Sequence, residues 1–127
     1  MKRMIVLLCA LALAACAADK KLTRAEDTLR LYAQQIRWNM FDGAATLIDV
    51  GKHPEVDPAP LKNFKVVSYI PVRRVDEEDG NTILQTVRIG YYDDRTARRS
   101  EVMDHQVWRY DDETKRWRLD GALPPFK

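Results

Sequence analysis

The stretch "QVWRYDDETKRWRL", residues 106–119, decides the fold, because it predicts a β-hairpin with two unlike faces. Aromatic and charged side chains alternate on both sides of its turn-forming residues. Two registers are open. A loop at 111–114 places Trp108 opposite Trp117, and a loop at 112–115 places Tyr110 opposite Trp117 and Trp108 opposite Leu119. Because the registers differ by two residues, both put these four side chains on one face.

An aromatic sheet face must be covered by another layer, and an earlier helix supplies the cover. Residues 22–40, "LTRAEDTLRLYAQQIRWNM", predict that helix, with Thr23 and Glu26 as a capping box at its start. Residues 41–51 predict a second, short helix with Asp42 as its N-cap and Gly51 at its end, and the prolines of 52–60 predict a loop. The apolar side chains of the first helix form one stripe at helical spacing: Ala25, Leu29, Tyr32, Ala33, Ile36 and Met40.

Four strands are predicted at 64–75, 82–92, 100–110 and 115–123, because the apolar period changes to two after residue 61. Short turns separate them, and short connections make neighbouring strands antiparallel. Asp79 and Gly80 are a hairpin signal, and Pro71 predicts that the first strand lies at an edge or carries a bulge. The predicted fold class is therefore α+β, with the N-terminal helix and a short helix packed on a four-strand antiparallel meander.

The N-terminus has the layout of a secretory signal, in which Lys2 and Arg3 precede an apolar run that ends in small residues and Cys16. The run is too short for a transmembrane helix, which needs roughly 20 apolar residues. "LAAC", residues 13–16, resembles the lipobox of bacterial lipoprotein precursors. This resemblance implies cleavage before Cys16 and acylation of its thiol, and Ala17 after it favours the outer membrane. The expected organisation is a signal peptide at 1–15, a lipidated N-terminus and tether at 16–21, and one α+β domain at 22–127.

Composition argues against several kinds of partner and site. Loss of Lys2 and Arg3 with the signal would turn 21 basic and 19 acidic residues into 19 of each, so we expect no nucleic-acid partner. Cys9 would be removed with the signal peptide and Cys16 would be acylated, so neither cysteine is left for a disulfide or a metal. The two histidines lack metal-ligand spacing. We therefore expect no disulfide, no metal and no cofactor. The sequence also lacks a glycine-rich phosphate loop and a nucleophile elbow.

Asp104 is the candidate catalytic residue. Counting by two from Trp108 places Asp104, Gln106 and Tyr110 on the inward face and His105 on the outward face. Asp104 and His105 therefore cannot form a dyad with each other. A carboxylate on an inward face needs a partner or a wet pocket, so a structural and a catalytic interpretation of Asp104 both stay open.

The order of elements resembles the nuclear transport factor 2-like superfamily, which includes polyketide-cyclase-like and limonene-epoxide-hydrolase-like enzymes. The residues that carry the resemblance are Asp42, Gly43, Trp108, Trp117, Pro124 and Phe126. The resemblance implies a curved sheet that wraps the first helix into a cone with an open pocket, and a homodimer through the sheet. This chain has only a loop at 51–60, where larger members often insert more structure. The pocket-lining residues expected on this basis are Tyr32, Ile36, Asp104, Gln106, Trp108, Tyr110 and Trp117.

These interpretations predict an outer-membrane-anchored periplasmic lipoprotein that meets the membrane through its N-terminal lipid. Its expected role is non-catalytic binding of a small apolar ligand or of a periplasmic protein. One alternative is a small hydrolase, isomerase or dehydratase that uses Asp104 with a pocket tyrosine. Another is a structural accessory of an envelope complex. The pocket separates them, because an enzyme needs a polar group deep in an open cavity, whereas a scaffold would have the cavity filled.

Overall fold

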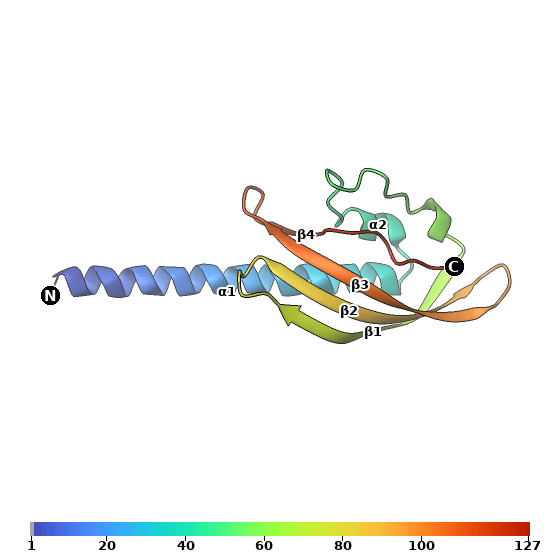
Figure 1. Ribbon diagram of the computed structural model, residues 1–127, viewed down its shortest axis with the longest axis horizontal. Helices are drawn as coiled ribbons and strands as arrows, with labels where there is room; N and C mark the ends of the chain where they lie inside the picture. The colour runs from blue at the N-terminus through green and yellow to red at the C-terminus, as the bar shows by residue number, and fades with distance from the viewer. Residues whose placement is uncertain (1) are drawn as a thin grey trace.

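Figure 1 shows a long N-terminal helix lying along a four-strand sheet, in a computed structural model that describes residues 2–127. Helix α1 spans Lys2–Arg37, α2 spans Phe41–Ala45, and a 3-10 turn, η1, spans Ala59–Leu61. The strands are β1 (Phe64–Asp76), β2 (Thr82–Asp93), β3 (Arg99–Asp111) and β4 (Arg116–Leu119), and their order in the sheet is β1-β2-β3-β4 with antiparallel neighbours. This confirms the predicted α+β class and the meander.

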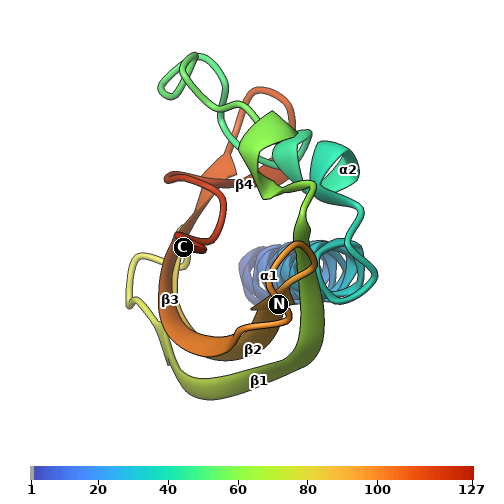
Figure 2. The same ribbon diagram turned by 90° about the vertical axis from the view of Figure 1, so that its right-hand side faces the viewer.

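The sheet is curved and wraps around α1, as the view along the helix in Figure 2 shows. Two irregularities in the pairing of β1 with β2 help it to bend, one between Val66 and Ser68 and one between Pro71 and Arg73. Opposite the first, Gly90 makes room for Ser68, whose Oγ would lie 2.5 Å from a Cβ added to the glycine. The prediction for Pro71 is confirmed on both counts, because β1 is an edge strand and its register shifts there.

The hairpin of β3 and β4 adopts the second of the two predicted registers. Tyr110 pairs with Trp117, and Trp108 pairs with Leu119. Lys115 closes the turn in the left-handed backbone region, with φ of 59°. Trp108 and Trp117 are buried, so the aromatic face of the hairpin points into the core as predicted.

Helix α1 covers this aromatic face. Tyr32 packs edge-on against Trp108, with ring centroids 5.2 Å apart and planes at 79°. The prediction for Met40 is wrong, because α1 ends at Arg37 and Asn39 has a left-handed φ of 61°, which leaves Met40 55% exposed. The rest of the stripe is half-buried at Ala33 and buried at the other positions, namely Ala25, Leu29, Tyr32 and Ile36.

Helix α1 starts much earlier than predicted, and the capping box is wrong. Thr23 lies inside the helix, where its hydroxyl donates a hydrogen bond to the Asp19 carbonyl at 2.9 Å. Residues 8–18 are almost all alanine and leucine, which favour helix strongly, so the helix runs through the predicted start. Within residues 2–127 no helix is both long and apolar enough to cross a membrane.

The second helix is shorter than predicted. The N-cap position is Met40 rather than Asp42, and no side chain caps it. Residues 47–49 join the free edge of β4 instead of continuing the helix. The Leu119 N–H donates to the Leu47 carbonyl at 2.8 Å, and the Asp49 N–H donates to the Leu119 carbonyl at 2.9 Å. The loop predicted at 52–60 is confirmed except at its end, where η1 begins.

Candidate functional site

A polar cluster lies inside the curved sheet, around Asp104 on β3. Asp104 is only 5% exposed, and its Oδ2 accepts a hydrogen bond from Gln106 Nε2 at 2.9 Å. Gln106 Nε2 also donates to the Tyr69 hydroxyl at 3.0 Å, and Gln106 Oε1 accepts from Trp108 Nε1 at 3.0 Å. Gln106 therefore links the carboxylate, the phenol and the indole in one network. His105, in contrast, is exposed on the outer face, as the period of two predicts.

Burial disfavours charge on every titratable group of this cluster. Burial raises the pKa of Asp104, and the hydrogen bond from Gln106 offsets only part of that rise. Burial also raises the pKa values of Tyr69 and Tyr32, with the negative charge of Asp104 adding to both shifts. The Tyr32 hydroxyl is buried without a hydrogen-bond partner among the described residues. Burial thus favours the neutral form of Asp104, Tyr69 and Tyr32 in this cluster.

The seven expected pocket residues fall into a group that lines an open pocket and a buried group that does not. The buried group, namely Tyr32, Ile36, Asp104, Gln106 and Trp108, is absent from the walls of three open pockets on the described part of the chain. Tyr110 and Trp117 do line one of these pockets. Tyr32, Ile36 and Trp108 belong to the packed core cluster, so side chains fill the cone at the level of Asp104, and the opening lined by Tyr110 and Trp117 lies elsewhere. Each residue of the buried group is at most 5% exposed.

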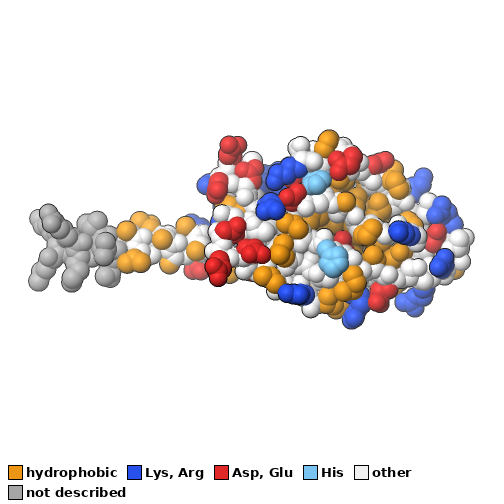
Figure 3. Space-filling view, viewed as in Figure 1, with side chains coloured by type: hydrophobic (Ala, Val, Ile, Leu, Met, Phe, Trp, Pro, Cys, Tyr) orange, Lys and Arg blue, Asp and Glu red, His pale blue; other side chains and the backbone are white. Residues whose placement is uncertain are grey.

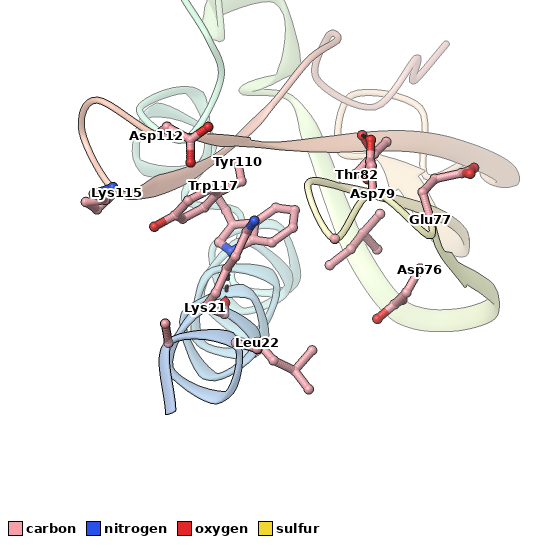
Figure 4. Close-up of a pocket in the computed structure, with 14 residues that line it drawn as sticks. Lys21, Leu22, Asp76, Glu77, Asp79, Thr82, Tyr110, Asp112, Lys115 and Trp117 are labelled. Carbon is pink, nitrogen blue, oxygen red and sulfur yellow. Dashed lines mark hydrogen bonds between the residues drawn. The ribbon is translucent and has the colours of Figure 1, made fainter. Parts of the chain in front are cut away.

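The opening with Tyr110 and Trp117 has a volume of about 520 Å³ and lies at the end of the sheet where α1 leaves it (Figure 4). Helix α1 contributes Leu22, β2 contributes Ile83, and the β3–β4 hairpin contributes Tyr110 and Trp117. These side chains make the lining largely apolar. We call this cavity the anchor-side pocket, because it lies toward the N-terminal half of α1. Its other lining residues are Ala17, Ala18, Lys21, Asp76, Glu77, Asp79, Gly80, Thr82, Asp112 and Lys115.

Several contacts fix α1 against the hairpin at this pocket. The Trp117 indole N–H donates to the Lys21 carbonyl at 3.0 Å, and the Lys21 ammonium lies 4.4 Å from the centre of the Tyr110 ring. Lys21 Nζ also donates to the Asn81 side-chain oxygen in the β1–β2 turn. One lysine therefore ties α1 to both hairpins, so the walls of the pocket are held by specific bonds.

The rim of the anchor-side pocket is acidic. Figure 3 shows carboxylate side chains gathered where α1 leaves the domain, and Asp76, Glu77, Asp79 and Asp112 line the pocket there. Part of this charge is already engaged. Asp76 accepts from Arg74 Nε at 2.7 Å, and Asp79 accepts from the Asn81 N–H at 2.7 Å.

Cys16 is exposed on α1 and directly precedes Ala17, the first pocket residue in the chain. A lipid on Cys16 would therefore be attached beside the pocket mouth. Sequence reasoning did not find Lys21, Leu22 or Ile83 as pocket residues. Leu22 continues the apolar stripe of α1, three residues before Ala25 and seven before Leu29, yet it is 49% exposed. This extra apolar position at helical spacing is the signal that could have found it.

The described residues contain no group of three or more histidine, cysteine, aspartate or glutamate side chains that could hold a metal ion. The geometry therefore offers an apolar pocket with a charged rim and a closed polar cluster. Comparisons with protein-family models, with curated proteins and with solved structures find no match to this chain.

Proposed function

We propose that this chain is the precursor of an outer-membrane-anchored periplasmic lipoprotein whose domain binds a small apolar or amphipathic molecule without catalysis. The lipobox-like "LAAC" at 13–16 supports acylation at Cys16. The observation that carries the binding role is the anchor-side pocket, which is largely apolar and whose first lining residue in the chain, Ala17, follows Cys16. A molecule leaving the membrane surface would meet this pocket first.

The curved sheet around α1 supports the resemblance to the nuclear transport factor 2-like superfamily, which stays a proposal. In that superfamily the cone opens into a pocket. Here the apolar cavity lies between α1 and the two hairpin turns, and the middle of the cone is filled. A binding role that uses the pocket mouth fits this arrangement.

A catalytic role has one observation in its favour, the raised pKa of Asp104. Tyr69 connects that residue's network to the surface, because its hydroxyl accepts from Gln106 and its side chain lines an open pocket of about 300 Å³ between α1 and β1. A substrate in that pocket would meet the tyrosine before the carboxylate. The enzyme alternative therefore requires an opening movement at Tyr69.

A protein partner, including a second copy of this chain, is the remaining alternative. The convex face of the sheet carries exposed apolar side chains, each 37–44% exposed. They lie on β1, β2 and β3, on the side that α1 does not cover. They are Ile70, Val75, Leu84 and Met103.

Binding of a neutral fluorescent probe, N-phenyl-1-naphthylamine, tests the proposed role of the anchor-side pocket. Leu22→Glu places a carboxylate at the pocket wall, and we expect it to weaken probe binding by about tenfold, because roughly 1.4 kcal/mol of apolar contact is lost. The matched control is Leu31→Glu, which changes a similarly exposed leucine of α1 outside the pocket. Equal binding by both variants would contradict the proposal.

A further inference from the structure

A second open cavity, of about 640 Å³, lies on the other side of the β3–β4 hairpin. We call it the basic groove. Its walls come from α1 through Arg24 and Thr28, from the segment after α2 through Thr46 and Leu47, and from the hairpin through Arg118 and its neighbours. Trp117 and Lys115 line both this groove and the anchor-side pocket, so the two cavities meet at the β3–β4 hairpin.

The groove carries an excess of positive charge. Among the described residues that line it, Arg24, Lys115, Arg116 and Arg118 are cationic and Asp27 is acidic. Asp27 already pairs with Arg30 at 3.3 Å. The lining therefore holds four cations against one carboxylate, an excess of three positive charges.

A nearby carboxylate outside the lining does not remove this excess. Asp111 lies opposite Arg116 in the β3–β4 ladder. Its carboxylate accepts the Glu113 N–H at 3.0 Å, and its pKa is lowered mainly by hydrogen bonds within the turn, with Arg118 a smaller cause. Its charge is thus used chiefly to hold the turn.

Two of the guanidinium groups are positioned by backbone carbonyls. Arg24 donates one N–H to the Lys115 carbonyl at 3.4 Å, and Arg118 donates one N–H to the Thr46 carbonyl at 3.5 Å. Each guanidinium has five N–H donors, so several remain for a ligand. The hydroxyls of Thr28 and Thr46 donate to backbone carbonyls within their own segments. Recognition in the groove therefore falls to the cations.

We propose that the basic groove binds an anion with two or more phosphate charges. Guanidinium forks match phosphate oxygens in a bidentate manner, and four cations around one cavity favour a multiply charged ligand over a single carboxylate. Arg24 is eight residues after Cys16, which is about 12 Å along the helix. The phosphates can therefore come from anionic lipid headgroups at a membrane surface or from a free diphosphate. The headgroup source rests on the proposed acylation of Cys16, whereas binding of a free diphosphate depends neither on that acylation nor on ligand binding in the anchor-side pocket.

The test uses the full chain, labelled with ¹⁵N, in neutral detergent at about 0.15 M ionic strength, where distant charges are screened. One arm adds inorganic pyrophosphate. The other dopes the micelles with phosphatidylglycerol, whose singly charged headgroups can supply two phosphates side by side, with zwitterionic phosphatidylcholine as the comparison without net charge. The readout is the backbone amide signals of Thr46 and Arg116, which line the groove and not the anchor-side pocket, together with the indole N–H signal of Trp117, which lines both. We expect a saturable shift with at least one of the two phosphate sources and none with phosphatidylcholine.

Variants separate the groove from general charge attraction. Arg118→Gln and Arg24→Gln should each weaken binding by about tenfold, the effect of losing one hydrogen bond to a charged group. Arg98→Gln is the control with the same change of charge, in the β2–β3 turn at the opposite end of the molecule (Figure 1). A shift with pyrophosphate alone assigns a soluble ligand, and a shift with phosphatidylglycerol alone assigns a headgroup. No shift with either source, or equal weakening by Arg98→Gln, would overturn the inference.

Discussion

Ile36→Ala distinguishes a filled cone from an open one. Ile36 has no exposed surface and belongs to the cluster that contains Tyr32 and Trp108. The substitution removes three carbon atoms, which at about 0.8 kcal/mol for each buried methylene gives roughly 2.4 kcal/mol. The cavity left in a packed core adds to this loss, so we expect a total of about 3–4 kcal/mol. Were Ile36 on the wall of a water-filled pocket, its side chain would already be partly hydrated, so both the transfer term and the cavity term would shrink and the cost would fall below about 1.5 kcal/mol.

Urea denaturation followed by circular dichroism measures this difference. A loss of about 3–4 kcal/mol in a domain of this size corresponds to a fall of roughly 12–25 °C in melting temperature, which thermal unfolding checks independently. The matched control is Gln34→Ala, an exposed position of the same helix, which should change stability by less than about 0.5 kcal/mol. A cost for Ile36→Ala below about 1.5 kcal/mol would refute the filled core.

Three further predictions follow from the polar contacts. Burial raises the pKa of Asp104 above that of an exposed aspartate, so this residue lowers stability as the pH rises from about 4 through its titration. The melting temperature of Asp104→Asn relative to the wild type should therefore be higher at about pH 8 than at about pH 4, and the opposite slope would contradict the assignment. The pKa of His53 is raised, chiefly by its 2.7 Å hydrogen bond to Asp120. His53→Ala should therefore lower the free energy of unfolding most below about pH 6.5 and progressively less as the pH rises. A loss of stability that does not change with pH would count against this ion pair. Trp117→Phe removes the indole donor to the Lys21 carbonyl and should lower stability by about 1 kcal/mol or more in urea denaturation, whereas an unchanged midpoint would show that this bond does not hold α1 on the hairpin.

The sequence was sufficient for the fold class because two different apolar periods coexist in it. The helical stripe with Leu29 and Ile36 leaves only one face of the helix to bury, and the alternation around Trp108 leaves only one face of the sheet. These two apolar faces cover each other in the structure. The register of the last hairpin stayed open, because a shift of two residues keeps the same face inward. The register depends on the geometry of the turn. In the register observed, the turn ends at Lys115, whose backbone is left-handed.

The helix start and the open pocket could not be predicted for a different reason. Both depend on how far α1 extends past Thr23, where local helix propensity competes with a capping signal. The anchor-side pocket is built in part from Ala17, Ala18 and Lys21 of this extension, together with two hairpin turns that are distant in sequence. Asp104 was correctly predicted to face inward, but periodicity does not reveal whether the space beside an inward residue is filled.

The most direct test of the proposed lipoprotein is the mass of the mature N-terminus. Intact-mass and peptide mass spectrometry of the protein extracted from bacterial membranes should find a chain that starts at Cys16 and carries acyl groups on it. Cys16→Ser should instead leave the uncleaved precursor with Lys2 and Arg3 still attached. A mature chain that begins at any other residue, or one that begins at Cys16 without lipid, would contradict the account.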